Sequence, residues 1–320
     1  MFDNINCTVI PSDAATDAGV AGAGVLLSFI ITAGISLILS AVLILREITR
    51  SSHESKVVRK LLLSFSDQQV ITGIGIQCVG LAKMEFMVPY HFFIIWMLSL
   101  LSTATHIGTL LALVQDFKRD WVLRWIRQFF MFVNLVLSCV SGIFLLMSTM
   151  RNLSQTLPIA CVWQVQSNGA ASNSTISVVG TIAVISGNCI MFVLGFWYLH
   201  VKERPWLKTI QVLGLVMSAA IAAGAAVRVI LLSQAFGKPS VDLRDGGERD
   251  WSFGQLLPML LLLLPLVSAV EIMRGEMRVP SIKDDEISLV ESHQPKPYGQ
   301  SSFQPNPFWG SSAAASRWSK

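Results

Sequence analysis

Long apolar stretches separated by short polar segments dominate this chain. Lipid offers the backbone no hydrogen-bond partners, and the stretches lack the short alternating runs of barrel strands, so each is predicted to be a helix. The pattern predicts an all-α protein with a seven-helix transmembrane bundle over 18–274, a polar tail over 1–17 and a disordered tail over 275–320. Seven stretches are long enough to cross a hydrocarbon core of roughly 30 Å, and they lie at about 18–45, 66–86, 91–114, 126–150, 176–199, 207–232 and 254–273.

Composition and charge support this class and give the bundle an orientation. Of the 320 residues 52% are apolar and 14% are charged, which leaves no soluble catalytic domain. Basic residues concentrate in the connections 46–60, 115–125 and 200–208. The positive-inside rule therefore predicts a lumenal or external N-terminus and a cytosolic C-terminus, in a multi-pass protein of the endoplasmic reticulum or another endomembrane. The net charge of +4 is mostly this signal, so nucleic acid is not an expected partner.

Glycosylation motifs and two cysteines share the predicted lumenal side. Asn6, Asn152 and Asn173 each begin an Asn-x-Ser/Thr motif, which predicts a glycoprotein. Cys7 and Cys161 lie on the same side, where an oxidising compartment would allow them to pair. The other three cysteines lie within helices, and no pair has metal-ligand spacing. The sequence predicts neither a metal site nor another cofactor.

Polar side chains inside the apolar stretches are the candidates for chemistry, because an unsatisfied polar group in hydrocarbon costs several kcal/mol. The second stretch opens with Asp67, Gln68 and Gln69, and His106 continues a stripe of hydroxyl residues on the third. Asp67 either caps the second helix or supplies an acid. His106 is either a structural hydrogen-bond hub or a group that titrates or binds a substrate. Arg228, near the lumenal end of the sixth stretch, is interpreted as snorkelling to the interface.

On the seven-helix topology these groups fall in the cytosolic half of the bundle. Asn134, Asp116 and Glu271 lie at similar depth, which predicts a pocket between the second, third, fourth and seventh helices. A retinal protein is excluded because the last stretch has no lysine, and the His-Glu-x-x-His motif of zinc peptidases is absent. No internal repeat typical of secondary transporters is visible.

Several short motifs resemble one group of proteins. Ser64 to Gln69 with Thr72-Gly73, then Tyr90-His91-Phe92, and Ser102 to His106 resemble the SDQQ, TG, YH and STH pattern of fungal seven-helix integral membrane proteins. The resemblance covers about residues 20–275. Members of the group resemble the membrane-bound terpene cyclase of the ascofuranone pathway. The resemblance implies a metal-independent, isomerase-type cyclase of meroterpenoid secondary metabolism, with a lipophilic prenylated substrate and with pathway enzymes as partners.

Acid-initiated cyclisation of an epoxidised prenyl chain suits these residues. The reaction needs a protonated carboxylic acid and a dry chamber whose aromatic faces stabilise carbocations. Asp67 is the candidate acid, oriented by Gln68 and Gln69, while His106 either deprotonates the last cation or positions the epoxide oxygen. A seven-helix receptor or sensor, and a carrier for a hydrophobic metabolite, are the alternatives. The candidate substrate-binding residues are Phe92, Phe93, Trp96, Asp116 and Asn134, with Phe132 as a further wall residue.

Overall fold

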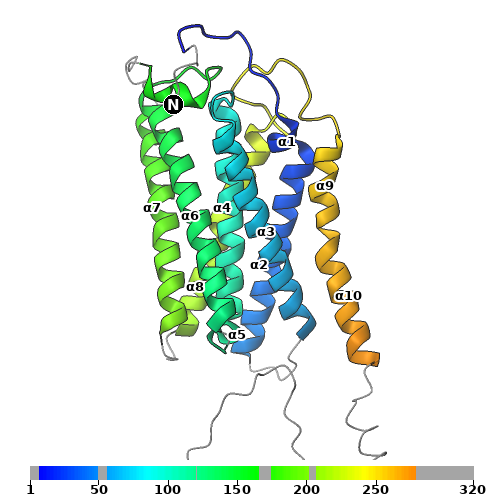
Figure 1. Cartoon of the computed structure of the whole chain (residues 1–320). Helices are drawn as coiled ribbons and strands as arrows, with labels where there is room; N and C mark the ends of the chain where they lie inside the picture. Colours follow the sequence, from blue (N-terminus) through cyan, green and yellow to red (C-terminus); the bar gives the residue numbers. More distant parts are fainter. Residues whose placement is uncertain (1–6, 50–55, 120, 166–173, 202–206, 279–320) are drawn as a thin grey trace, which may run out of the picture. The chain divides into compact units, whose positions relative to one another are not determined.

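The computed structural model describes residues 7–49, 56–119, 121–165, 174–201 and 207–278 (Figure 1). The all-α fold is confirmed, because these residues contain no β-strand beyond a single-residue bridge between Ala14 and Leu243. The helices, in chain order, are α1 (Ala18–Ala21), α2 (Ala23–Ile48), α3 (Lys56–Ala82), α4 (Pro89–Ala112), α5 (Val114–Arg119), α6 (Trp121–Met150), the 3-10 helix η1 (Ile159–Trp163), α7 (Ser174–His200), α8 (Leu207–Leu232), α9 (Phe253–Leu261) and α10 (Leu263–Arg278).

Six helical segments of the described chain are long and apolar enough to cross a membrane, so this is a multi-pass membrane protein. α3 is the one predicted span outside this set. It has 27 residues, but Asp67 and three glutamines lower its hydropathy. It nevertheless packs against α2, α4 and α6. The six segments are Ala18–Ile48, Pro89–Ala112, Trp121–Met150, Ser177–His200, Leu207–Leu232 and Phe253–Glu271.

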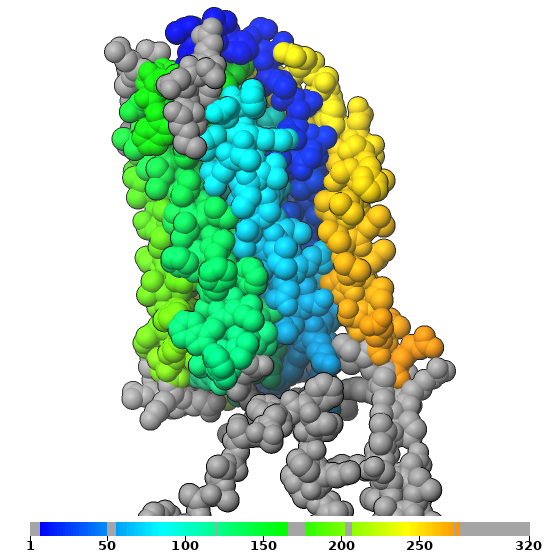
Figure 2. All heavy atoms as spheres, viewed as in Figure 1, coloured from blue at the N-terminus to red at the C-terminus, as the bar shows by residue number. Residues whose placement is uncertain are grey.

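α4 is the central helix and is buried along nearly its whole length. Its sequence is apolar on every side and carries no charged residue other than histidine, which is the pattern of a helix enclosed by others. α2, α3, α6 and α8 surround it. Gly73 lets α3 approach closely, since a Cβ there would lie 2.6 Å from the Ser102 hydroxyl. Figure 2 shows the side chains of α3 and α6 meeting along one face of the bundle.

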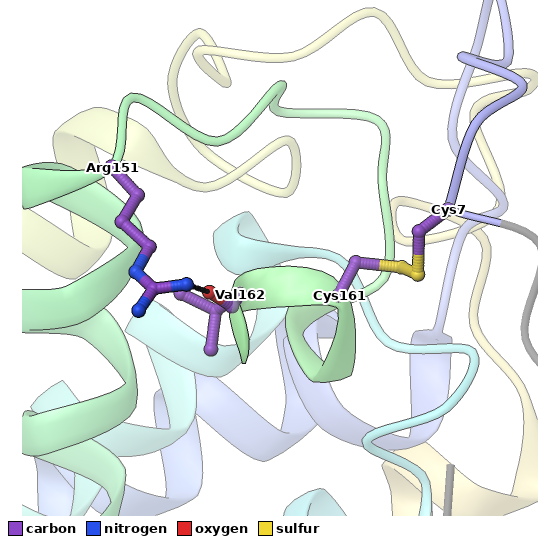
Figure 3. The surroundings of a disulfide bond; sticks show 4 residues. All are labelled: Cys7, Arg151, Cys161 and Val162. Atoms are coloured by element: carbon purple, nitrogen blue, oxygen red, sulfur yellow. Dashed lines mark hydrogen bonds between the residues drawn. A yellow bond between two sulfur atoms is a disulfide. The ribbon is translucent and has the colours of Figure 1, made fainter. Parts of the chain in front are cut away.

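A disulfide between Cys7 and Cys161 ties the N-terminal segment to η1 (Figure 3). The two Cα atoms are 5.6 Å apart, and Cys161 is fully buried. Beside it, Arg151 at the end of α6 donates a hydrogen bond of 2.9 Å to the Val162 carbonyl. We call this the disulfide end of the bundle. Asn152 is exposed there, whereas Asn6 and Asn173 lie outside the described residues.

A buried carboxylate fastens the loop before α9 to the disulfide end. Glu248 has no exposed surface, and its two oxygens accept from the Tyr90 hydroxyl at 2.8 Å and pair with His91 Nε2 at 2.6 Å. The backbone N–H of Gln234 donates to the same tyrosine at 2.8 Å. The YH pair of the sequence therefore has a visible structural role. A buried carboxylate is stable only when its oxygens are paired in this way.

The C-terminal boundary shifts slightly. α10 continues to Arg278, so the predicted tail begins within a helix at residue 275 rather than after it. Residues 279–320, on which the prediction of a disordered tail rests, lie outside the described residues.

Candidate functional site

Four polar side chains meet between α3, α4 and α6, and we call them the polar cluster: Ser66, Asp67, His106 and Arg127. Asp67 Oδ1 accepts a hydrogen bond from Arg127 Nη2 in an interhelical ion pair. Arg127 Nη1 lies 3.3 Å from the Ser66 hydroxyl, which lies 3.2 Å from His106 Nδ1. The Arg127 side chain is only 5% exposed, whereas that of Asp67 is 49% exposed. The cluster therefore connects a buried histidine to a carboxylate at the bundle surface.

The start of α3 decides between the two roles considered for Asp67. The helix begins at Lys56, so Asp67 lies about three turns inside it. The capping alternative is therefore wrong, because a cap residue stands at the helix boundary. Gln69 is buried and donates to the Phe29 carbonyl at 3.3 Å, away from the Asp67 carboxylate. Gln68 is half-buried, and no hydrogen-bond partner of its buried Oε1 is found in the described part of the chain.

One ring nitrogen of His106 is paired and the other is not. Ser66 accepts from Arg127 and can either donate to His106 Nδ1 or accept from it, because a hydroxyl oxygen has two lone pairs. Nε2 is buried and has no hydrogen-bond partner among the described residues. His106 lines a void of about 10 Å³ together with Asn134 and Thr103.

A much larger cavity of about 760 Å³ lies between α4, α6, α7 and α8. α7 and α8 both pack on α4, and the cavity occupies the space between them. Phe93 and Trp96 of α4 form its inner wall, and small residues such as Gly187 and Gly224 leave room in the walls formed by α7 and α8. Gly224 is exposed, as are several other lining residues of α7 and α8, so the cavity reaches the surface between these helices.

The polar cluster adjoins this cavity. Thr103 and Ile107 line both the large cavity and the small void beside His106. These two residues of α4 form a wall shared by the large cavity and the void beside His106. The mostly apolar cavity therefore has the unpaired Nε2 of a buried histidine beside one of its walls, where it can hydrogen-bond a polar group of a ligand.

The predicted site residues divide between the chamber and other places. Trp96 and Phe93 line the large cavity. Phe92 does not, because it is fully buried against Phe144 with the ring centres 5.9 Å apart. The predicted wall role of Phe132 is also wrong, since 53% of its surface is exposed and it is absent from the cavity wall.

Two further predicted residues have structural partners. Asn134 lines the small void, accepts from Gln77 at 2.8 Å and donates to Thr103 at 2.9 Å. Asp116 does not bind in the chamber, because it forms an ion pair with Arg59 at 2.9 Å in which both side chains are partly exposed.

The contacts of the described residues do not support the predicted pocket with the seventh helix. α9 packs against α1 and α2, and Glu271 in α10 is exposed. The chamber instead uses α7 and α8, which the polar pattern did not indicate. Sequence reasoning also gave no role to Arg127. A signal was present, because Arg127, Asn134 and Ser141 recur every seven residues and hence lie on one face of α6.

Comparison with protein-family models, curated proteins and solved structures gives no match to this chain. Its class therefore rests on the fold and the site. The protein is a multi-pass helical membrane protein with an apolar cavity in its bundle and a buried polar cluster beside that cavity.

Proposed function

We propose that this protein is a membrane-bound terpene cyclase of meroterpenoid biosynthesis, which cyclises an epoxidised prenyl chain attached to an aromatic ring. The observation that carries the proposal is the mostly apolar cavity of about 760 Å³ beside the unpaired Nε2 of His106. Its volume is in the range of small-molecule sites. Its position between α7 and α8 gives a lipophilic substrate a route from the bilayer.

The proposed reaction converts the substrate into an isomer. The epoxide oxygen gains a proton as its C–O bond breaks, a prenyl double bond supplies the electron pair of the new C–C bond, and the last cation loses a proton. His106 Nε2–H positions the epoxide oxygen by donating a hydrogen bond to it. Trp96 and Phe93 shield the cations from water and offer aromatic faces to them.

Asp67 remains our candidate for the proton donor. A carboxyl group that carries a proton is no longer a charged partner for a guanidinium, so Asp67 must leave its ion pair with Arg127 before it can donate. Arg127→Met should then preserve cyclisation, while Asp67→Asn abolishes it. Equal loss in both variants would instead make the ion pair a positioning device and would remove Asp67 as the acid.

We further propose that α3 is a seventh span and that the disulfide end is lumenal. α3 packs within the bundle against α2, α4 and α6. Disulfides persist in oxidising compartments, and the Cys7–Cys161 bond and exposed Asn152 share one end. This orientation leaves α5 and the basic connections on the cytosolic side, as the positive-inside rule requires, and is consistent with the endoplasmic reticulum.

A microsome assay tests the proposed activity. Membranes containing the protein are incubated with an epoxyfarnesyl aromatic compound without added metal, and products are separated by chromatography with mass detection. Gly187→Leu should lower conversion at least about tenfold, because its side chain would project into the cavity. Gly75→Leu is the matched control, since the space beside Gly75 is also open but lies outside the cavity. No conversion over a panel of such substrates would refute the cyclase.

A receptor or sensor is the second candidate. Interhelical ion pairs of the kind that can switch join α3 to α6 through Asp67–Arg127 and α3 to α5 through Arg59–Asp116. A ligand that binds in the cavity without being converted, and whose affinity changes when either pair is broken, would favour this function.

A further inference from the structure

The large cavity has one charged residue in its wall. Arg228 of α8 lines the cavity about one turn before α8 ends at Leu232. Thr149 lies in the last turn of α6, and Ser177 and Thr181 lie in the first two turns of α7. All four residues line the cavity, so its charged group and three hydroxyl residues lie toward the disulfide end.

The hydroxyl groups at this end do not neutralise Arg228. Thr149 donates to the Leu145 carbonyl at 3.0 Å, and Thr181 donates to the Ser177 carbonyl at 2.9 Å. No carboxylate is among the described residues that line the cavity. Within the described ranges Arg228 has neither an ion pair nor a hydrogen bond. A guanidinium bordering an apolar space without a counter-charge favours an anionic ligand.

The opposite end of the cavity has no charged residue among the described residues that line it. Ile107, Met191 and Met217 line it there together with Thr103, Asn188 and Ser218, and Thr103 and Ile107 also line the small void beside His106. The distance along α8 from Met217 to Arg228 is about 16 Å from the helical rise. The cavity therefore carries its charge at one end and can take a prenyl chain lengthwise, with one end at Arg228 and the other near His106.

We infer that Arg228 binds a carboxylate on the aromatic ring of the substrate, so that the substrate class is a prenylated aromatic acid. This inference rests on the proposed function and sets the direction of the substrate. A carboxylate held by the planar guanidinium fork at the disulfide end places the far end of the prenyl chain, which carries the epoxide, next to His106. Arg228 is also exposed, in agreement with the snorkelling expected for it, so it borders both the cavity and the surface of the bundle.

Binding of an unreactive probe tests the inference separately from catalysis. The full-length protein in nanodiscs of zwitterionic lipid is titrated with a farnesyl-substituted benzoic acid that has no epoxide, and with its methyl ester. The wild type should bind the acid at least about tenfold more tightly than the ester. Arg228→Gln should abolish this preference and leave ester affinity unchanged, and Arg228→Lys should restore part of it.

Arg244→Gln is the matched control. Arg244 is exposed, lies near the same end and pairs with Asp13 outside the cavity, so its loss should leave the preference for the acid intact. Equal preference in wild type and Arg228→Gln would overturn the inference alone. The inference would also be overturned if anionic lipid in the nanodisc removed the preference of the wild type for the acid, since a lipid headgroup would then be the anion at Arg228. Failure of both probes to bind would overturn the proposed prenyl chamber as well.

Discussion

Asp67→Asn should destabilise the protein more than Arg127→Met, although each removes one half of the same ion pair. Asparagine keeps the size of Asp67 but removes its charge, so the guanidinium of Arg127 stays buried without a counter-ion. Its remaining hydrogen bonds, to the Ser66 hydroxyl and the Leu63 carbonyl, are both 3.3 Å long. Methionine removes the buried charge itself and leaves Asp67, whose half-exposed side chain water can reach.

The structure sets the size of this asymmetry. Stranding one charge of a fully buried pair costs about 3–5 kcal/mol. The exposure of Asp67 admits water near the guanidinium, so we expect about 2 kcal/mol for Asp67→Asn. Arg127→Met loses a cation–π contact with Phe117, whose ring centre lies 4.9 Å from the guanidinium carbon. It removes the desolvation cost at the same time, so we expect below about 1 kcal/mol.

Equilibrium unfolding in mixed detergent and SDS micelles measures both changes, and the double variant completes a mutant cycle. Asp67→Asn/Arg127→Met should be more stable than Asp67→Asn alone, because the second change removes the stranded charge. Asp116→Asn is the control, since its partly exposed pair with Arg59 should contribute only a few tenths of a kcal/mol. The reasoning fails if Arg127→Met costs more than Asp67→Asn, or if the double variant is the least stable of the set.

Three further predictions concern other parts of the bundle. Cys161→Ser should lower the free energy of unfolding by about 3 kcal/mol, and reductant should lower the thermal midpoint of the wild type but not of the variant, because the bond to Cys7 constrains the unfolded chain. Gly73→Ala should destabilise by about 1–3 kcal/mol because its methyl group meets α4, whereas Gly75→Ala, which meets open space, should be neutral or stabilising by up to about 1 kcal/mol in the same SDS titration. Hydrogen bonds from a threonine hydroxyl and a backbone N–H lower the pKa of Asp245 below 3.8. The contribution of this carboxylate to stability is therefore present above that pH and is lost as the pH falls through the pKa of the folded state. The thermal midpoints of wild type and Asp245→Asn should differ at pH 6 and converge toward pH 3.

The fold was predictable because the apolar stretches have the length and continuity of spanning helices. α3 is the exception, because its hydropathy and its packing lead to different conclusions about whether it is a spanning helix. Asp67 and the glutamines lower its hydropathy, yet Gln69, Gln77 and Gly73 face neighbouring helices in the structure. The low hydropathy separates α3 from the six apolar segments, whereas its contacts with neighbouring helices place it among them in the bundle. Gln69 and Gln77 are buried against protein, which satisfies polar groups that hydrocarbon does not, whereas the Asp67 side chain is 49% exposed.

The site was only partly predictable, because its shape depends on how the helices are rotated and spaced. Neighbouring positions in one helix separate sharply, with Phe93 in the cavity wall and Phe92 in the core. Periodicity places both on α4 but does not reveal which neighbour each one meets. The sequence pattern did not indicate a site role for Arg127, because this residue lies near a basic connection, where the positive-inside rule alone accounts for a cation.

The cavity depends on how α7 and α8 pack against the central helix. α4 is apolar and buried along nearly its whole length, and both α7 and α8 contact it. Those two helices carry Gly187 and Gly224 toward the cavity, and small side chains there cannot close the gap between the helices. A void of this size inside a soluble core would be destabilising. Next to a bilayer it can be filled by apolar chains, so this protein can keep an open chamber beside α4, whose Thr103 and Ile107 also line the void next to His106.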